Sequence, residues 1–561
     1  MAFDGIITKK VISELNNILA QGKINKVTQP NTQEVVLNVY SAGNNYNLLL
    51  CANPEFCRIG TTEYLKHNPQ NAYGFCMLLR KYLVGGKILE FKNYDLERTV
   101  EVKIECYNEL NDIVVRKLFI EIMSRQSNII LTNENNIIID SLKHIDSSSR
   151  ELLPAHEYTF SPINRISFIE TASYDDFYNA MTTNKDDSFS ISKQMSNTYI
   201  GISKSAVKEI LKILNIDDHD SSYESLVNVY NYYKSIIEKI PTNELKCFLI
   251  NKGKDYGYKL DEPSNESILE FLDNFYFEKE QKNLFSSTKN NLLKIVLVNL
   301  KKVTKKLENI NTKLQECNNL DKYRLYGELL TANIYRFKDL PNTESVTVEN
   351  YYDENKEITI PLDKKLGYQK NIERYFKRYD KLKNASAIVS IQKKETEAEI
   401  NYIESIVFSI DEAKTLEDLT EIYDEISEAF SLNQKQKSKV KNEKLSKDLK
   451  YDIRNINGYD VYVGKNNKQN DYISLRLAQG NDVWFHVQKY HGSHVLLRNP
   501  NNQEIDEDTL FKCACLAKEN SKAAESLNVP VDYCLAKFVK KQSGSKPGMV
   551  NYTNFSTIIV K

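Results

Sequence analysis

Residues 293–317 read LKIVLVNLKKVTKKLENINTKLQEC, and the apolar residues of this stretch recur at alternating intervals of three and four. Such a heptad pattern places one apolar stripe along a helix, and a partner helix has to cover that stripe. The stretch therefore predicts one arm of a coiled coil, with these seam residues: Leu293, Val296, Leu300, Val303, Leu307, Ile310, Leu314 and Cys317.

A second, weaker stripe follows and predicts the returning helix. Ser386, Lys393 and Thr396 interrupt it, and its apolar members are Ile372, Tyr375, Tyr379, Leu382, Val389, Ile400, Ile403, Val407 and Ile410. Residues 321–367 lack the pattern, which indicates a small tip between the arms. We therefore expect an antiparallel coiled-coil hairpin over residues 271–435, with arms on the order of 45 Å long and globular parts at its base.

The first arm has a one-sided charge, because residues 282–306 hold seven lysines and no acidic residue. A solvated coiled-coil face usually mixes both signs. Two interpretations stay open: the lysines form an ordinary soluble surface, or they contact the phosphates of a polyanion. The candidates for the second role are Lys294, Lys301, Lys302, Lys305 and Lys306.

The totals bound the class of protein. The 561 residues suffice for roughly three or four domains, and the net charge of −1 means that nucleic-acid binding would need local patches. The nine cysteines show no paired metal-ligand spacing, which fits reduced thiols in a cytosol. The start has no signal-peptide pattern, and no apolar run is long enough to cross a membrane. These features predict a cytoplasmic protein.

Residues 1–175 predict an α+β domain. Helical periodicity is expected at residues 12–19, 75–83 and 114–123. Alternation bounded by turn residues predicts strands at residues 35–40, 48–51, 98–106, 128–131 and 137–140.

Arg98 begins the otherwise apolar face of the strand expected at 98–106, and Glu97 precedes it on the opposite face. In one interpretation the Arg98 stem covers the rim of the core and its head reaches water. In the other, the strand edge presents the guanidinium group to a ligand beside Glu97. The residues alone leave both open.

Residues 176–270 predict a helical region with a helix-hairpin-helix. A short helix carries Ile191, Met195 and Tyr199, Gly201 sits in a tight turn, and Ser203 can cap the helix that follows. Such a turn and helix start can present backbone N–H groups to a phosphate. A plain helical hairpin without that role is the alternative.

Two segments of opposite charge follow the coiled coil. Residues 411–428 contain eight acidic residues against Lys414, which predicts a solvated helix. Residues 436–450 are rich in lysine and poor in apolar groups, which predicts a flexible basic linker and a second candidate for phosphate contact.

Residues 451–561 predict a separate α/β domain. Strands are expected at 459–463, 482–486, 493–497 and 531–538, helices around Leu475 and at 510–526, and a closing strand within 549–560. Residues 464–470 are expected to form a polar loop, and residues 540–548 a basic turn.

The search for chemistry gives no assembled active site. His486, His491 and His494 lie across a turn, and no Cys or carboxylate completes a plausible zinc tetrahedron. Cys513 and Cys515 are two residues apart on an expected helix and face different ways, which suits core positions. No phosphate loop, dinucleotide fingerprint or serine elbow occurs. We therefore expect no catalytic residue, metal or cofactor.

Several runs resemble NFACT proteins, in the right order over nearly the whole chain, and most closely the bacterial branch of that family. They are Phe3-Asp4-Gly5, FCMLLRK at 75–81, SNIIL at 127–131, YGELLTAN at 326–333, YYD at 351–353, GKNNKQN at 464–470, DVW at 482–484 with His486, GSHV at 492–495 and KPG at 546–548.

The resemblance implies a fold: a glycosylase-like N-terminal domain, a helix-hairpin-helix, the coiled coil and a C-terminal RNA-binding domain. It also implies a function. Family members bind large ribosomal subunits that still hold a peptidyl-tRNA and recruit alanyl-tRNA for template-free addition of a C-terminal alanine tail, which marks the chain for degradation. The ribosome makes the bond, so the factor is no enzyme. A small RNA-binding partner for translocation is a further implied contact.

The family handles tRNA with an Asp-Arg pair, which reads Glu97-Arg98 here, so the carboxylate is kept but lengthened by a methylene. Asp4 matches another acidic position used for tRNA. The lysines named above then become candidates for rRNA binding. In the terminal domain, His491 replaces a usual Pro and Gln542 replaces another, and both changes lie in expected turns.

Two alternatives remain. The first is a surface adhesin that binds fibronectin, since this family has often carried that label. The second is a DNA-repair glycosylase, suggested by the N-terminal resemblance. Those enzymes use an N-terminal proline nucleophile, whereas this chain starts Met-Ala-Phe-Asp.

Overall fold

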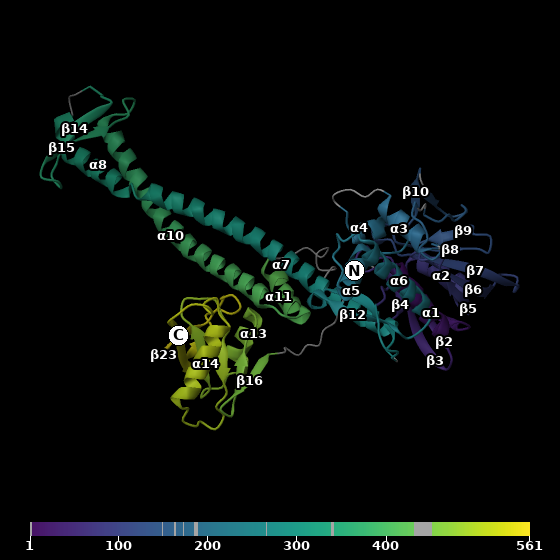
Figure 1. Ribbon diagram of the computed structural model, residues 1–561. Helices are drawn as coiled ribbons and strands as arrows, with labels where there is room; N and C mark the ends of the chain where they lie inside the picture. Colours follow the sequence, from purple (N-terminus) through teal and green to yellow (C-terminus); the bar gives the residue numbers. More distant parts are fainter. Residues whose placement is uncertain are drawn as a thin grey trace. The chain divides into compact units, whose positions relative to one another are not determined.

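The computed structural model describes residues 3–148, 150–161, 164–171, 173–183, 189–264, 266–337, 341–430 and 451–561 (Figure 1). The chain forms two compact units, Met1–Asn283 and Leu284–Lys561. The predicted basic linker at 436–450 lies outside the described residues.

The first unit is built on a nine-stranded sheet of antiparallel neighbours, in the order β4-β3-β2-β1-β5-β6-β7-β8-β9. Its strands are β1 (Lys23–Asn31), β2 (Glu34–Ser41), β3 (Asn44–Cys51), β4 (Arg58–Thr61), β5 (Lys87–Lys92), β6 (Thr99–Tyr107), β7 (Ile113–Glu121), β8 (Asn128–Thr132) and β9 (Ile138–Ser141).

Local sequence decides several of these elements. β2 and β3 meet in a two-residue turn in which Ala42 and Gly43 both have positive φ, the geometry that suits a tight hairpin. The helix predicted at 114–123 is wrong, because this stretch forms β7 and pairs with β6 from Thr99↔Glu121 to Tyr107↔Ile113. The apolar run is short and rich in β-branched residues, and such a run cannot be distinguished from a helix by periodicity alone.

Helices complete the core of the first unit. They are α1 (Gly5–Leu19), α2 (Gly74–Leu83), α3 (Tyr174–Thr182), α4 (Ile191–Thr198), α5 (Lys204–Leu214) and α6 (Tyr223–Lys239). The predicted helices at 12–19 and 75–83 are confirmed, the first as part of a longer helix. A short pair, β10 (Ile145–Ser147) with β11 (Arg150–Leu152), and a hairpin, β12 (Leu245–Ile250) with β13 (Asp255–Leu260), complete the unit.

One apolar core joins the sheet to the helical part, since a single buried cluster includes Phe3 of the N-terminus, Leu96 before β6, Ile210 of α5 and Tyr276.

Single-turn 3-10 helices lie at Ser124–Gln126 and Asn251–Gly253. The predicted α4-turn-α5 arrangement is present: Gly201 has φ 70°, and the Ser203 hydroxyl accepts a hydrogen bond of 3.3 Å from the backbone N–H of Ala206.

The second unit contains the predicted antiparallel coiled coil. Its long helices are α7 (Ile268–Cys317), which begins in the first unit, and α10 (Tyr368–Glu412). Lys289 Nζ donates to the carbonyl of Asp411 at 2.7 Å, and Lys306 forms an ion pair with Glu399 at 3.5 Å. Because the partner number falls as the number on α7 rises, the helices run antiparallel. Val296, Val303, Ile403 and Ile410 of the predicted seams are buried between them.

A small domain with its own core separates the arms, at the place where a tip was expected. It contains α8 (Leu320–Ala332), α9 (Ile334–Phe337) and the hairpin of β14 (Ser345–Asn350) with β15 (Lys356–Pro361). Leu329, Val348 and Ile360 form the centre of its core, and Ile372 of α10 joins them.

The acidic segment forms the helix α11 (Leu416–Ala429). The sequence predicted a solvated helix here, but one face of α11 is buried. Leu419, Ile422 and Ile426 are buried in the same core as the base of the coiled coil. The number of acidic residues gave no sign of this apolar face, because the acidic residues fall between the buried positions.

The terminal domain has a six-stranded sheet in the order β16-β17-β19-β18-β20-β23. Its elements are β16 (Asp452–Ile456), β17 (Tyr459–Val463), α13 (Asn467–Tyr472), a π-helical turn (Ile473–Leu477), β18 (Val483–Val487), β19 (Val495–Leu497), α14 (Glu507–Glu519), β20 (Val529–Leu535), a 3-10 turn (Ala536–Phe538), β21 (Val539–Lys540), β22 (Asn551–Tyr552) and β23 (Ser556–Val560).

Two predictions for this domain are corrected. The expected polar loop at 464–470 is helical from Asn467, because the Asn466 side chain caps the helix by accepting from the N–H of Gln469 at 2.9 Å. The helix expected at 510–526 ends at Glu519, where the chain leaves it and Ser521 pairs with Gly492. Among the described residues, no helix is long and apolar enough to cross a membrane.

Candidate functional site

Three segments that are distant in sequence meet at the start of α1. The backbone N–H of Gly5 donates to the carbonyl of Gly201 at 2.8 Å. A Cβ on Gly5 would lie 2.0 Å from the carbonyl oxygen of Leu96, and a Cβ on Gly201 would lie 1.9 Å from the same atom. Both positions therefore require glycine, and the loop that carries Glu97 and Arg98 is held between the helix-hairpin-helix turn and the N-terminus.

Asp4 fastens this junction from inside. Its side chain accepts hydrogen bonds from the N–H of Ile7 at 3.2 Å, the hydroxyl of Ser203 at 2.9 Å and the hydroxyl of Tyr258 at 3.2 Å. Only 2% of Asp4 is exposed. Burial raises the pKa of its carboxyl to about 6, although these hydrogen bonds and the charge of Arg98 lower it. Asp4 thus joins α1, α5 and β13, and the protein encloses its carboxyl almost completely.

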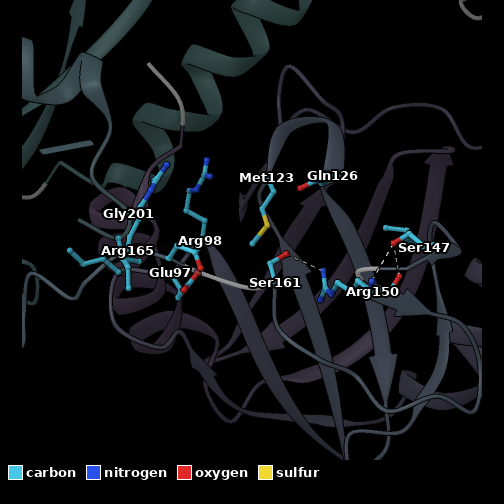
Figure 2. Close-up of a pocket in the computed structure, with 13 residues that line it drawn as sticks. Glu97, Arg98, Met123, Gln126, Ser147, Arg150, Ser161, Arg165 and Gly201 are labelled. Carbon is cyan, nitrogen blue, oxygen red and sulfur yellow. Dashed lines mark hydrogen bonds between the residues drawn. The ribbon is translucent and has the colours of Figure 1, made fainter. Parts of the chain in front are cut away.

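Glu97 and Arg98 had been expected on a strand. The structure places them in the loop just before β6. Strand alternation would have placed them on opposite faces, but in the loop both line one cavity of about 490 Å³. Figure 2 shows Glu97, Arg98 and Arg165 on one side of this cavity, and Ser147 and Arg150 on the other.

The three arginines of the cavity differ in their partners. Arg150 is held by Glu121, with Nη1 donating to Oε2 at 3.0 Å, and it also donates to Ser161 at 3.3 Å. Within the described part of the chain, no hydrogen bond or ion pair joins the guanidinium groups of Arg98 or Arg165 to a protein group. These two groups remain available to an anion from outside.

Glu97 is half-buried between these charges. Burial and the neighbouring Asp95 raise the pKa of its carboxyl, and Arg98 and Arg165 lower it. The arrangement places one acceptor and two strong donors at one cavity. It is suited to a ligand that carries both phosphates and hydrogen-bond donors, because a guanidinium group binds phosphate oxygens in a two-pronged geometry.

Sequence reasoning found Glu97 and Arg98 but missed Arg165 and Arg150. Arg165 is exposed in a stretch without regular structure, between α3 and the end of the sheet region, and no periodic pattern marks it. The turn at Gly201 carried a signal, since Ile-Gly-Ile between two helices predicted a tight turn. Its contact with Leu96 had no sequence signal.

The candidate lysines of α7 are all exposed: Lys294, Lys301, Lys302, Lys305 and Lys306. Lys306 pairs with Glu399, whereas no ion pair of the other four occurs among the described residues. Lys301 and Lys305 line a shallow groove of about 390 Å³ together with Leu297, whose side chain is 49% exposed. The lysines thus form an open cationic face on one arm.

The side chains of the GKNNKQN run at 464–470 form hydrogen bonds and an ion pair with other parts of the protein. Its side chains contact α11 as follows: Lys465 pairs with Asp418 at 3.4 Å, Asn466 and Gln469 each donate to Glu421 at 2.7 Å, and Asn467 donates to Glu425 at 2.9 Å. The acidic face of α11 is therefore a dock for the terminal domain.

The histidines of the terminal domain are packed structural groups. His494 Nδ1 shares a hydrogen bond of 2.7 Å with Ser474, whose hydroxyl also accepts from the indole N–H of Trp484 at 2.9 Å. Burial lowers the pKa of His486 to about 4 and that of His494 well below its usual value. In the part of the chain that the structure describes, no group of three or more His, Cys, Asp or Glu could hold a metal ion.

The comparisons with known proteins cover the whole chain. The profile of the NFACT N-terminal and middle domains matches residues 4–445, and that of the NFACT protein RNA binding domain matches residues 450–554. The chain is 34% identical to the Rqc2 homolog RqcH of Bacillus subtilis (strain 168), over 100% of this chain and 98% of that protein.

A second full-length relative and one solved structure are also similar to this chain. The Rqc2 homolog RqcH of Streptococcus pneumoniae is 30% identical over 100% of this chain and 98% of its own length. The solved N-terminal part of the fibronectin/fibrinogen-binding protein from Streptococcus suis is 27% identical, with a TM-score of 0.40, and covers 50% of this chain and 100% of its own. This TM-score is too low to support an argument about fold or function. From the two profiles and the full-length relatives, the chain belongs to the NFACT family.

Proposed function

We propose that this protein acts in ribosome-associated quality control. It binds large ribosomal subunits that are obstructed by a peptidyl-tRNA and brings alanyl-tRNA to them. Alanines are then added to the stalled chain without a template, and the resulting C-terminal tail marks the chain for degradation.

Membership of the NFACT family supports a role in ribosome quality control. Both full-length relatives carry the name Rqc2 homolog, and residues 450–554 match an RNA-binding domain. These similarities support partners made of RNA or ribosomal particles. The choice of alanyl-tRNA and the addition of an alanine tail go beyond what these similarities support and are part of the proposal.

The single observation that carries the tRNA site is the pair of arginines Arg98 and Arg165 at the cavity beside Glu97, whose guanidinium groups have no hydrogen bond or ion pair to the described residues. In the bound state, we expect the two guanidinium groups to hold tRNA phosphates. The Glu97 carboxylate would accept from a ribose hydroxyl or a base amino group. Asp4 takes part indirectly, because it holds the loop and the turn that form the cavity wall.

The open lysine face of α7 supports contact with rRNA. Lysine–phosphate contacts depend on salt, and RNA helices are bound mainly through backbone and shape. Lys294, Lys301, Lys302 and Lys305 are best suited to this contact, because Lys306 is partly neutralised by Glu399. These lysines would bind rRNA phosphates in the subunit without recognising a particular base sequence.

The protein is not proposed to be an enzyme. The cavity at Glu97 offers charge and hydrogen bonds but no nucleophile with an adjacent base among the described residues that line it. The peptidyl-transferase centre of the ribosome forms the bond, so the factor works where ribosomes are, in the cytoplasm. Fibronectin binding remains a separate prediction, which a pull-down with immobilised fibronectin would test.

The first experiment identifies the bound RNA. The protein is purified from cells of its own host, and its RNA is sequenced. We expect alanine tRNA together with rRNA of the large subunit, enriched over a mock purification. If neither class is enriched, the proposal is wrong.

The second experiment tests the site. Arg98→Ala should abolish alanine tailing and tRNA recovery and leave cosedimentation with large subunits largely intact. Arg125→Ala is the matched control, because Arg125 is an exposed arginine near the cavity that does not line it. Tailing at the wild-type level in Arg98→Ala would contradict the assignment of this site.

A further inference from the structure

A second cavity, of about 320 Å³, lies in the terminal domain at one end of its sheet. Its walls come from the start of β18, the end of β20 and the start of β23, together with the loop after β19. It takes no part in the docking of this domain to α11, which uses residues 465–469. Its volume falls at the lower end of the range of small-ligand pockets, about 300–1,000 Å³.

The chemistry of this cavity is uncharged and rich in amides. Among the residues that line it are Asn481, Asn502, Gln503 and Asn554, with the aromatic rings of Tyr533 and Phe538. None of the described lining residues is charged. Each side-chain amide offers two donors and one acceptor oxygen, so a few of them can match the mixed edge of a flat heterocycle.

Three of these amides have no partner among the described residues. Asn481, Asn502 and Asn554 are exposed, and no hydrogen bond of their side chains to the described residues occurs. Gln503 has one long contact, from the hydroxyl of Tyr459 at 3.4 Å. The hydrogen-bonding capacity at the mouth of the cavity is therefore available to a ligand.

A buried carboxylate holds the wall of the cavity in place. Asp482 is fully buried, accepts from the N–H of Asn499 and the N–H of Gln479 at 2.8 Å each, and pairs with Arg498 at 2.9 Å. The Asn499 side chain closes the loop after β19 through hydrogen bonds of 2.9 Å and 2.8 Å with the backbone of Gln503. The cavity is thus formed before any ligand arrives, which lowers the entropic cost of binding.

A cation lies next to one of the aromatic residues that line the cavity. The Lys537 ammonium lies 5.2 Å from the centre of the Phe538 ring, and Lys537 is exposed. No ion pair of Lys537 occurs among the described residues. A cation beside an aromatic face and a group of amides matches the parts of a nucleotide: a phosphate, a flat base and its polar edge.

We propose that this cavity binds a single unpaired base of an RNA strand, with the amides at the edge of the base and Lys537 at its phosphate. The inference rests on the proposed RNA-binding function and adds a site to it. Specific recognition of RNA is typically of unstacked bases in loops and ends, read by hydrogen bonds and stacking. The terminal domain would then distinguish bases, whereas the lysines of α7 would not.

The test measures base preference with the full-length protein. Fluorescein-labelled ten-nucleotide RNAs of adenine, cytosine or uracil are titrated and followed by anisotropy. The wild type should prefer one base. Asn481→Ala combined with Asn554→Gly should lower that preference by roughly threefold to tenfold per amide removed. Glycine is chosen at position 554 because Asn554 has φ 50°.

Two controls locate the effect. Asn501→Ala removes an exposed amide beside the cavity that does not line it, and it should keep the preference. Lys537→Gln should weaken binding equally for all three RNAs and reduce the salt dependence by about one phosphate contact. These outcomes separate base contacts from phosphate contacts.

Equal binding of the three RNAs by the wild type, or an unchanged preference in the double variant, would overturn the inference. Cosedimentation of the same proteins with large subunits keeps the two proposals distinguishable. If subunit binding persists while no base preference exists, only this inference fails. If RNA binding and subunit binding are both absent, the proposed function fails as well.

Discussion

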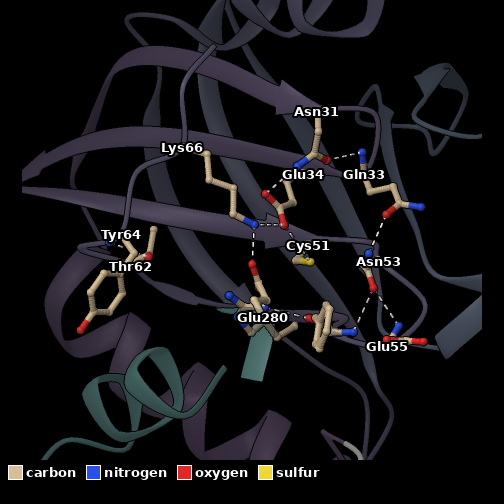
Figure 3. Close-up of polar contacts among 12 residues, drawn as sticks. Asn31, Gln33, Glu34, Cys51, Asn53, Glu55, Thr62, Tyr64, Lys66 and Glu280 are labelled. Carbon is tan, nitrogen blue, oxygen red and sulfur yellow. Dashed lines mark hydrogen bonds and ion pairs between the residues drawn. The ribbon is translucent and has the colours of Figure 1, made fainter. Parts of the chain in front are cut away.

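Two groups of charged side chains in the first compact unit differ in how their charges are paired. Glu34, Arg58, Lys66 and Glu280 form a closed network, in which Arg58 binds Glu280 at 2.9 Å. In the same network, Lys66 binds both Glu34, at 2.7 Å, and Glu280, at 2.5 Å (Figure 3). In the cavity of Figure 2, Arg98 and Arg165 lie beside Glu97, and their guanidinium groups form no such contacts with the residues that the structure describes.

The difference separates a structural role from a ligand-binding role. Arg58 is almost fully buried, and its charge is tolerable only because Glu280 compensates the lost hydration. The network fastens the first turns of α7 to β2 and β4. Among the described residues, no hydrogen bond or ion pair occupies the guanidinium groups of Arg98 and Arg165, so an incoming phosphate displaces no protein partner. Removing a charge should therefore cost stability in the first group and binding in the second.

The largest effect is expected for Arg58→Ala. The change leaves Glu280 with Lys66 alone in a largely buried place, and removal of one partner of a buried pair typically costs about 3–5 kcal/mol. Urea unfolding of the full chain should show this loss. Asn283→Ala is a suitable control, because it removes only an exposed contact to Glu55 at the same end of α7. Equal stability of Arg58→Ala and wild type would mean that the network is not structural.

The second effect depends on pH and concerns Asp4. Because burial raises the pKa of Asp4 from its ordinary value of 3.8 to about 6, the folded protein holds this proton more tightly than the unfolded chain. The free energy of unfolding therefore falls as pH rises from about 4 to 6 and is constant above that window. The full change is on the order of 3 kcal/mol.

Asp4→Asn should remove that dependence. Comparison of urea midpoints of the variant and the wild type at pH 4, 5, 6 and 7 measures it, with the difference moving in favour of the variant as pH rises. A difference that does not change across these pH values would contradict the raised pKa of Asp4.

A smaller effect is expected for Gly201→Ala. The left-handed backbone alone costs alanine about 1–2 kcal/mol, and the new Cβ would collide with the carbonyl of Leu96. The loop that carries Glu97 and Arg98 has to move, so tRNA recovery should fall while cosedimentation with subunits persists. Gly43→Asn is the control, since asparagine tolerates the positive φ there and nothing lies within 4 Å of its Cβ. Normal tRNA recovery with Gly201→Ala would show that the turn does not position the loop.

The smallest effect on stability is expected for Arg165→Ala. Arg165 is exposed and has no hydrogen bond or ion pair within the described part of the chain, so this change should alter the free energy of unfolding by no more than about 0.5 kcal/mol. Its loss should still weaken tRNA binding and make that binding less dependent on salt. Arg150→Ala should instead lower the free energy of unfolding, because buried Glu121 loses its ion-pair partner and keeps the hydrogen bond from Tyr158. If Arg165→Ala retained tRNA binding with an unchanged salt dependence, Arg165 would have no role in the cavity.

The sequence predicted the elements whose signals are local. The heptad seam from Leu293 predicted α7 and its partner, and alternation bounded by turn residues predicted the two strands of the β2–β3 hairpin. It failed where a local pattern was ambiguous, as at residues 114–123, where β-branched residues pair in a sheet. It also failed at α11, where charge concealed an apolar face.

The candidate site was predictable only in part. Glu97 and Arg98 were found through a family resemblance, but their place in a loop, their shared cavity and the buried position of Asp4 were not. Arg165 carried no signal, because an exposed arginine in an irregular stretch looks the same whether or not it binds a ligand.

By itself the sequence determined the long helices, most strands and the membership of a family, because periodicity, turn residues and motifs act over a few residues at a time. The tertiary structure alone decided which charges are paired. Residues near positions 5, 97, 165 and 201 come together only after a sheet and several helices have packed, and whether a guanidinium group then meets a carboxylate or water depends on neighbours distant in the chain.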